Sequence, residues 1–245
     1  MDTVFHRLIR KARHKQSFLA TCRANGLMLD YGENASGIGI FKEIFVQRAY
    51  ADFFPFHEAA TVIDIGGHFG YFALFAAVNL ADKGQVITVE PSRHNFEKLE
   101  RNLNQSGFGK KVLALNRAVA PIAGSLKLYT GKSENNTLVA PSEGGSWEMT
   151  EAITLDELIG DLSMVHFLKM DCEGAEYEVL YGADRGVLDR IQTISMEFHD
   201  LKSAQKNGLK LAQFLKSSGF NVVRFHHNTT SMGNNYGHIV ATKAL

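Results

Sequence analysis

Residues 61–70 constrain the fold of this chain more than any other part of its sequence. They read Thr-Val-Ile-Asp-Ile-Gly-Gly-His-Phe-Gly, and an almost wholly apolar run follows over residues 71–81. This pattern predicts a buried strand, a tight turn and a helix, with glycines where something must approach the backbone closely. The N-terminus of a helix offers unpaired N–H groups to an anionic ligand group. We therefore expect this turn to bind a nucleotide-type cofactor.

The spacing of the glycines narrows the choice of cofactor. A dinucleotide-binding turn has the pattern Gly-x-Gly-x-x-Gly, whereas this chain has Asp64-x-Gly66-x-x-x-Gly70, with the acid on the strand. The difference argues against an NAD-dependent oxidoreductase. Turns of this kind are also common without a ligand, so a purely structural turn is the alternative at this point.

The next predicted strand ends in an acid. Residues 85–90 read Gln-Val-Ile-Thr-Val-Glu, and Pro91 then blocks further strand pairing. Glu90 lies at about the distance from the glycine turn at which nucleotide-binding units place a carboxylate on ribose hydroxyls. An isolated acid in this position could simply be solvated. Because Asp64 and the glycines precede it at this spacing, we favour ribose binding.

Three later blocks complete the pattern. They are Thr-Leu-Asp-Glu-Leu at 154–158, Phe-Leu-Lys-Met-Asp-Cys-Glu-Gly-Ala-Glu at 167–176 and Met-Glu-Phe-His at 196–199. Together with the glycine turn, these blocks resemble the FkbM-type family of S-adenosylmethionine-dependent methyltransferases, over roughly residues 37–199. The Lys-x-Asp-x-Glu-Gly-Ala-Glu block is the most specific part. One departure is Gly67-His68, where the family usually carries Ala-Asn, so the turn could be shaped differently here.

The resemblance implies a Rossmann-like class I methyltransferase fold, a doubly wound α/β sheet of seven mostly parallel strands with one antiparallel strand at its end. The alternation of the sequence itself predicts strands and helices in turn. Strands are expected at 61–65, 85–90, 111–119, 164–170, 190–197, 219–226 and 236–243, and helices at 70–81, 92–106, 154–160, 174–186 and 203–217.

Two regions divide the predicted organisation. Residues 1–58 are expected to form an extension at the front of the acceptor site, with a basic helix and short strands at 27–31 and 37–41. Residues 59–245 are expected to form the methyltransferase domain. Residues 131–150 show no helical or strand period, so they predict a long loop. Trp147 in that loop could stack on a substrate ring or pin the loop to the core.

The cofactor that the resemblance implies is S-adenosylmethionine. Asn116 closes the third predicted strand, where its amide could bond the adenine edge or stabilise a turn. The predicted cofactor-binding residues are Asp64, Gly66, Gly67, His68, Phe69, Gly70, Glu90, Asn116 and Asp171.

Candidate catalytic residues follow two later strands, because open α/β sheets bind ligands at the carboxyl ends of their strands. They are Asp171, Glu173 and His199. His199 is the predicted general base, since imidazole titrates in the useful range; capping its strand or bonding Glu197 is the alternative. Lys169 lies inside an apolar strand and either acts in the site or pairs with Asp171 or Glu197.

A metal ion is not predicted. His68, Asp171, Glu173 and His199 could converge, but the chain contains no tight His-x-x-x-His or Cys-x-x-Cys ligand spacing. A sulfonium methyl group needs little activation. The protein must position the acceptor in line with it and remove the acceptor's proton.

The predicted reaction is O-methylation of a hydroxyl on a sugar, glycan or polyketide-like small molecule. N-methylation of an amino sugar or an amino acid is the alternative within enzymes. A nucleotide-binding module without catalysis is the alternative from another class. The sequence leaves the acceptor and the oligomeric state open.

Composition excludes several other classes. In 245 residues, 26 Lys and Arg balance 26 Asp and Glu, so there is no global basic field for nucleic acid. No apolar segment reaches the ~20 residues of a membrane span, and the distant Cys22 and Cys172 indicate a reducing compartment. We therefore expect a cytoplasmic protein. A basic cluster is expected to be a solvated helix face or, less favoured, a peripheral membrane contact; it comprises Arg7, Arg10, Lys11, Arg13 and Lys15.

Overall fold

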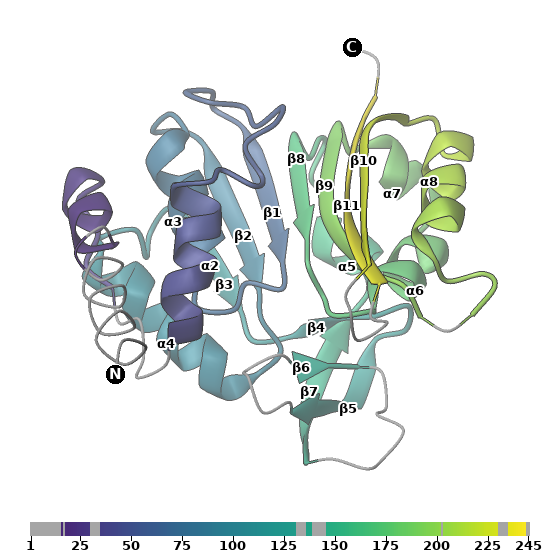
Figure 1. Ribbon diagram of the computed structural model, residues 1–245, viewed down its shortest axis with the longest axis horizontal. Coiled ribbons are helices and arrows are strands. Elements are labelled where there is room, and N and C mark those ends of the chain that lie inside the picture. Colours follow the sequence, from purple (N-terminus) through teal and green to yellow (C-terminus); the bar gives the residue numbers. More distant parts are fainter. Residues whose placement is uncertain are drawn as a thin grey trace, which may run out of the picture.

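A central β-sheet with helices on both faces forms the body of the molecule (Figure 1). The structure is a computed structural model. This structure describes residues 16, 18–29, 35–130, 136–138, 146–201, 203–229 and 235–243. The basic cluster of the N-terminal region lies outside the described residues.

The main sheet has seven strands in the order β10-β11-β9-β8-β1-β2-β3. β11 runs antiparallel to both of its neighbours, and the other strand pairs of this sheet are parallel. The predicted doubly wound sheet with one antiparallel strand is thus confirmed. Its strands are β1 (Thr61–Ile65), β2 (Gln85–Val89), β3 (Val112–Leu115), β8 (Phe167–Met170), β9 (Thr193–His199), β10 (Asn221–Thr229) and β11 (Asn235–Thr242).

Burial on both faces explains why the central strands read as apolar runs. All five residues of β1 and all four of β8 are buried, as expected for parallel strands that helices cover on both sides. Val62 packs into one hydrophobic cluster and Ile63 into the other, because successive side chains point to opposite faces. Each helical layer therefore has its own core.

The helices divide between the two faces. α2 (Ala35–Phe45), α3 (Tyr71–Asn79) and α4 (Arg93–Gln105) cover one face, with the aromatic-rich cluster beneath them (Figure 1). The other face is covered by α5 (Leu155–Ile159), α6 (Glu176–Gly182), α7 (Arg185–Asp189) and α8 (Gly208–Ser217). The strand order changes direction between β1 and β8, and ligands of open α/β sheets bind at such a switch point.

A second, four-stranded sheet projects below the carboxyl ends of the main strands (Figure 1). Its order is β4-β7-β5-β6, formed by β4 (Ala118–Val119), β5 (Gly124–Thr130), β6 (Asn136–Thr137) and β7 (Trp147–Ile153). Two predictions were wrong here. Residues 111–119 form two strands in different sheets, and residues 147–150 belong to a strand rather than a loop. Most residues of β7 are exposed or half-buried, so this strand lacks the strong apolar alternation that reveals a strand.

Three other element predictions were also wrong. Residues 37–41 lie in α2, whose buried positions Gly37, Phe41 and Ile44 follow helical rather than strand spacing. Residues 27–29 are irregular, and the rest of that predicted strand lies outside the described residues. The predicted helix 174–186 is split, because the Asp184 side chain accepts a hydrogen bond from the Gly186 N–H and starts α7.

Two general features bear on the sequence predictions. Among the described residues, no helix is both long enough and apolar enough to cross a bilayer. Both cysteines are free thiols, and Cys22 is buried in the aromatic-rich cluster.

Candidate active site

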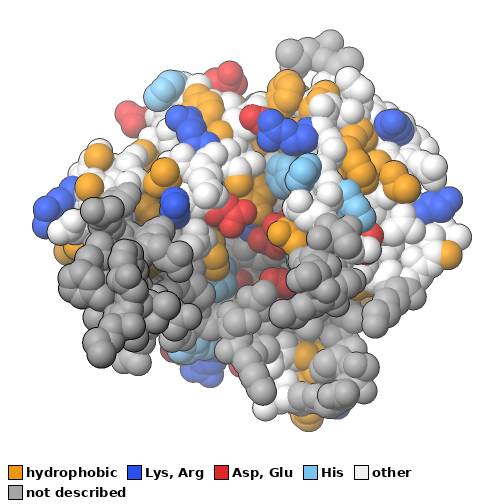
Figure 2. Space-filling model, viewed as in Figure 1, with side chains coloured by type: hydrophobic (Ala, Val, Ile, Leu, Met, Phe, Trp, Pro, Cys, Tyr) orange, Lys and Arg blue, Asp and Glu red, His pale blue; other side chains and the backbone are white. Residues whose placement is uncertain are grey.

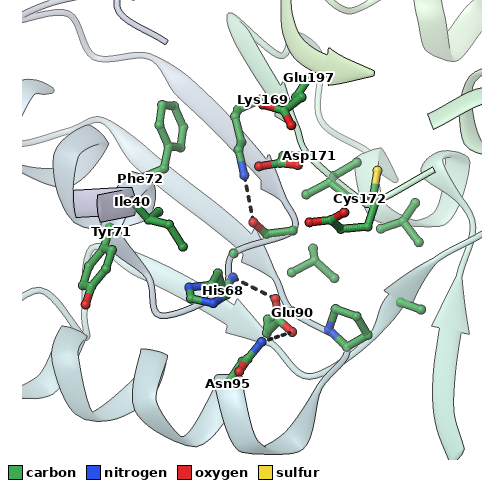
Figure 3. A pocket seen from close by; sticks show the side chains of 18 of the residues that line it. Ile40, His68, Tyr71, Phe72, Glu90, Asn95, Lys169, Asp171, Cys172 and Glu197 are labelled. Carbon is green, nitrogen blue, oxygen red and sulfur yellow. Dashed lines mark hydrogen bonds between the residues drawn. The ribbon is translucent and has the colours of Figure 1, made fainter. Parts of the chain in front are cut away.

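A cavity of about 280 Å³ opens at the switch point, at the carboxyl ends of the central strands (Figure 3). Residues from the glycine turn, the ends of β2 and β8, and β9 line one side. The N-terminal segment contributes Ile40, Glu43, Ile44 and Tyr50 to the lining. The small sheet region contributes an apolar side that includes Ala118, Val119 and Leu128.

The glycine turn is required by the close approach of two strand ends. Gly66 has a φ of 82°, and a Cβ placed on it would overlap the backbone carbonyl oxygen of Asp171. A Cβ on Gly67 would overlap Thr88 Oγ1. The turn therefore tolerates no side chain at either position, and its backbone lies directly against the cavity.

A buried ion pair supports this turn from behind. Asp64 is fully buried and Lys169 is 4% exposed; Lys169 Nζ lies 3.1 Å from Asp64 Oδ1 and donates to the Gly66 carbonyl oxygen at 2.8 Å. Burial alone would lower the pKa of Lys169, but the Asp64 and Asp171 carboxylates raise it above its ordinary value. Lys169 therefore pairs with Asp64 and not with Asp171 or Glu197, the partners considered from the sequence, and it also lines the cavity. Asp64 is not in the cavity lining and acts through the turn.

Glu90 is a buried carboxylate at the cavity wall, 4% exposed. It accepts hydrogen bonds from the His68 N–H at 2.7 Å and the Ser92 N–H at 3.0 Å, and from Asn95 Nδ2 at 3.4 Å (Figure 3). Burial raises the pKa of Glu90 to about 7, against these hydrogen bonds. The carboxylate is thus fixed in place at the point where ribose hydroxyls were predicted to bind.

The remaining predicted cofactor residues lie in different surroundings. His68 lines the cavity, and its φ of 48° continues the tight turn. Phe69 is in the hydrophobic core, and Gly70 is the N-cap of α3. Asn116 Nδ2 donates to the carbonyl oxygens of Glu90 and Pro91, which favours the turn-stabilising alternative for this residue.

The three predicted catalytic residues come together, with Asp171 and Glu173 lining the other end of the cavity and His199 beside them, outside the lining. Asp171 and Glu173 follow β8, and His199 ends β9. One ligand-capable atom from each lies within 4.8 Å of the other two. This arrangement could hold a metal ion, and the spacing along the sequence gave no sign of it.

Three carboxylates surround the His199 imidazole. Its Nε2 lies 3.5 Å from Glu173 Oε2 and 3.3 Å from Glu197 Oε1, and its Nδ1 lies 3.4 Å from Glu176 Oε1. Burial would lower the pKa of His199, but hydrogen bonds to Glu176 and Glu197 raise it to about 11. A ring in these surroundings holds its proton at neutral pH, which disfavours His199 as a general base. Burial and nearby Asp171 raise the pKa of Glu173 to about 7.

We call Glu43, Asp171, Glu173 and Glu197 the acidic rim, since all four carboxylates line this end of the cavity. Acidic side chains gather in the central hollow of the face shown in Figure 2. Tyr50 Oη donates to Asp171 Oδ2 at 3.4 Å, which ties the N-terminal segment to the rim. Among the described residues, no Lys or Arg forms an ion pair with a rim carboxylate.

Sequence reasoning missed Tyr50, Glu43, Asn95 and Glu176. Tyr50 and Glu43 belong to the segment before the glycine turn, where no motif marks them. Asn95 is one helical turn into α4, and its amide reaches back to Glu90. Glu176 lies in the helix predicted at 174–186 and was given no role in the site. In the structure its buried Oε1 accepts hydrogen bonds from the Cys172 and Gly174 N–H groups. Glu176 is the last residue of the Lys-x-Asp-x-Glu-Gly-Ala-Glu block, which is the sequence signal that could have indicated its role in the site.

Known proteins resemble this chain in sequence. Methyltransferase 1 from Beauveria bassiana is 28% identical over 207 residues, which cover 75% of this chain and 80% of that protein. Methyltransferase sdnD from Sordaria araneosa is 25% identical over 222 residues, covering 76% and 82%. The AMB antimetabolite synthetase AmbE from Pseudomonas aeruginosa is 25% identical over 224 residues, and this chain covers only 10% of that much longer protein.

Solved structures share the fold. The methyltransferase domain of METTL16 superposes with a TM-score of 0.53 at 12% identity, over 95% of this chain and 79% of that one. The model of the Methyltransferase FkbM domain matches residues 64–222, which include the glycine turn, Glu90 and all of the acidic rim except Glu43. This chain therefore belongs to the FkbM methyltransferase family, and it is an enzyme whose cofactor is S-adenosylmethionine.

Proposed function

We propose that this enzyme methylates a hydroxyl oxygen of a small acceptor, such as a sugar, a glycan or a polyketide-like molecule. The observation that carries the proposal is the acidic rim beside the glycine turn. A hydroxyl becomes a good nucleophile when its proton is removed, and a carboxylate within reach can take that proton. The rim offers such carboxylates at the end of the cavity away from Glu90.

The residues of the cavity fit the cofactor. Glu90 keeps about one free acceptor site for a ribose hydroxyl beside its three protein donors, since an ionised carboxylate offers about four acceptor sites. Gly66 and Gly67 leave backbone exposed to the cavity where any Cβ would clash. The apolar side, with Pro91, Ala118 and Val119, suits the adenine ring. We therefore assign the cofactor to the stretch between Glu90 and Asp171.

S-adenosylmethionine supplies a methyl group on a positively charged sulfur, which needs little activation. What remains for the chain is to hold the acceptor oxygen in line with that methyl group and to accept a proton. Asp171 lies next to the glycine turn and within the rim, so it borders both the cofactor and the acceptor in this assignment.

The segment before the glycine turn forms the front of the acceptor site in this proposal. α2 contributes Ile40, Glu43 and Ile44 to the lining, and Tyr50 reaches Asp171. In this proposal residues 1–58 are an extension of a methyltransferase domain over residues 59–245, with α2 packed on α3.

Trp147 on β7 is 49% exposed. The ammonium group of Lys127 lies over its ring, with Nζ 4.2 Å from the ring centroid.

N-methylation of an amino sugar or amino acid is the second candidate. The acidic rim favours it in one respect, because clustered carboxylates attract an ammonium group. An ammonium nitrogen has no free lone pair, however, so it also needs deprotonation before it can accept a methyl group. The names of the relatives include an antimetabolite synthetase, which supports a small-molecule acceptor of either kind.

The test uses the purified protein and radiolabelled S-adenosylmethionine. Pairs of acceptors that differ only in carrying a hydroxyl or an amine at one position are compared. We expect the label on hydroxyl oxygen, and transfer confined to amines would overturn the proposal. Glu173→Gln should lower turnover by roughly 10²-fold or more while the affinity for S-adenosylhomocysteine changes little. Glu151→Gln, an exposed change on β7, is the control.

A further inference from the structure

We propose that Asp171, Glu173 and His199 bind one divalent cation at the acceptor end of the cavity, and that this cation holds the acceptor oxygen. The role in holding the acceptor rests on the proposed function, whereas the binding of the cation does not. The three ligand atoms all lie within 4.8 Å of one another. Oxygen and nitrogen ligands bound at roughly 2.0–2.6 Å from one ion have separations in this range.

The orientation of the imidazole is the second observation. Metal-binding histidines commonly donate their other ring N–H to a carboxylate, which fixes the tautomer and turns the free nitrogen toward the metal. In this site the Nδ1 of His199 lies 3.4 Å from Glu176 Oε1. The Nε2 faces Glu173 and Glu197. In a ring with its proton on Nδ1 this nitrogen is free to bind a metal ion, and a cation between it and the carboxylates relieves their repulsion.

Glu176 is built into the fold as the partner of this ring. Its side chain is fully buried, and its Oε1 also accepts from the Cys172 and Gly174 N–H groups at 3.1 Å each. Its Oε2 is buried and has no hydrogen-bond partner within the described part of the chain. A buried carboxylate with an unpartnered oxygen is costly unless positive charge lies nearby. A cation bound to the opposite nitrogen of His199 would supply such charge close to Glu176.

The loop that carries Glu173 is also held in place. Thr137 Oγ1 on β6 donates to the Glu173 carbonyl oxygen at 2.7 Å, and Glu173 has a φ of 51°. The small sheet therefore fixes the backbone from which this carboxylate projects. Because the ligands come from β8, β9 and this braced loop, the site exists before any ligand arrives.

The charge of the surroundings favours a divalent ion. The carboxylates of the acidic rim and Glu176 crowd one small region, while the nearby Lys169 is already paired with Asp64. Two carboxylates and one imidazole suit a cation that prefers oxygen but accepts nitrogen, such as Mn²⁺ or Mg²⁺. Octahedral coordination leaves positions for water and the acceptor oxygen. The acceptor proton then passes to Glu197, which lies in the rim outside the ligand set.

The competing interpretation is a cluster without metal, in which a protonated His199 offsets the carboxylates. The two interpretations differ in a direct binding measurement. The whole protein is stripped with a chelator and titrated with Mn²⁺, without cofactor or acceptor, and the free ion is followed by electron paramagnetic resonance. We expect one saturable site per chain.

Variants locate the site. Glu173→Gln and His199→Asn should each weaken Mn²⁺ binding by more than tenfold, and Glu176→Gln by about 10- to 100-fold, the usual effect of losing an outer-shell partner. Glu151→Gln on β7 should bind Mn²⁺ as the unchanged protein does. Circular dichroism and affinity for S-adenosylhomocysteine establish that each variant is folded.

The outcomes separate the two proposals. No saturable Mn²⁺ binding by the folded protein, or binding that survives both ligand variants, overturns the metal site. Saturable binding together with methylation of amines alone supports the site and overturns O-methylation. Full turnover with hydroxyl acceptors in the stripped protein overturns the role of the cation in holding the acceptor.

Discussion

Glu90 combines a backbone role with a ligand role. Its carboxylate joins the glycine turn to the start of α4, through the N–H groups of His68 and Ser92. Burial raises its pKa from 4.5 to about 7. In the folded protein without ligand the group therefore takes up a proton near neutral pH, and this favours the folded state most below pH 4.5. That contribution is lost as the pH rises to about 7.

The affinity for S-adenosylhomocysteine should have the opposite dependence on pH. Ribose hydroxyls donate to the ionised carboxylate, so binding lowers the pKa of Glu90 and releases a proton. Between about pH 6 and about pH 8 we expect affinity to rise roughly tenfold. Calorimetry in two buffers of different ionisation enthalpy measures both the affinity and the released proton.

The neutral variant Glu90→Gln is the matched control for that experiment. It should bind S-adenosylhomocysteine roughly 10- to 150-fold more weakly, since one charge-assisted hydrogen bond is worth about 1.5–3 kcal/mol. It should also lose the dependence on pH. A folded variant with unchanged affinity would remove Glu90 from the cofactor site.

Gly66 and Gly107 allow a second test at this scale, because both have positive φ values, 82° and 78°. Among the described residues, a Cβ on Gly107 meets no atom within 4 Å, whereas one on Gly66 overlaps the Asp171 carbonyl. Gly107→Ala should cost about 1–2 kcal/mol, the penalty of the left-handed conformation alone. Gly66→Ala should cost clearly more and abolish cofactor binding. Equal losses in chemical denaturation would show that strand proximity is unimportant.

Some site residues could be predicted from the sequence and others could not. Gly66 and Glu90 follow strands at fixed spacing, so their place at one sheet edge follows from local pattern. Tyr50 and Glu43 enter the cavity only because α2 packs on α3, a contact between segments that no motif connects. The raised pKa of His199 depends on the Glu176 carboxylate. The turn before α6 holds this carboxylate beside His199, through the Gly174 N–H.

Neighbouring strands β1 and β8 share one buried ion pair, since Asp64 and Lys169 are direct partners in the register. Lys169→Met removes the charge but keeps the bulk, and leaves Asp64 buried without its partner. We expect a loss of about 3–5 kcal/mol in the free energy of unfolding. Cofactor affinity should fall as well, because the Gly66 carbonyl loses its donor.

The double variant Lys169→Met with Asp64→Leu is the control for the ion pair. It removes both buried charges, so it should recover much of the stability lost in the single variant. Denaturant titration of the single and double variants measures the difference. No recovery would mean that packing, not charge, accounts for the loss.

Elements with continuous apolar runs were predicted correctly, and those shaped by tertiary contacts were not. β1 and α3 are fully buried or nearly so, and their apolar runs mark them plainly. The segment 111–119 changes sheets at a turn held by the Asn116 amide, and the apolar residues on both sides of Asn116 and Arg117 conceal this change. α2 was read as a strand because its two glycines and isoleucines alternate over residues 37–40.

At the scale of the whole molecule, the alternation of strands and helices was enough to predict the fold class. The acceptor was not predictable, because its site is assembled from α2, β8, β9 and the small sheet, which lie far apart in the sequence. Net charge was also uninformative. The chain is neutral overall, yet the four carboxylates of the acidic rim gather at one end of the cavity.

The antiparallel strand β11 has a consequence for how the protein is made. β11 lies between β9 and β10, and β10 has no other strand partner in the main sheet. During synthesis β10 leaves the ribosome before the strand that connects it to the sheet. Until residues 235–242 emerge, β9 therefore presents an open edge that could pair with another nascent chain. The edge of β9 is covered only after β11 has been translated and has paired with it, and the risk of aggregation through this edge then ends.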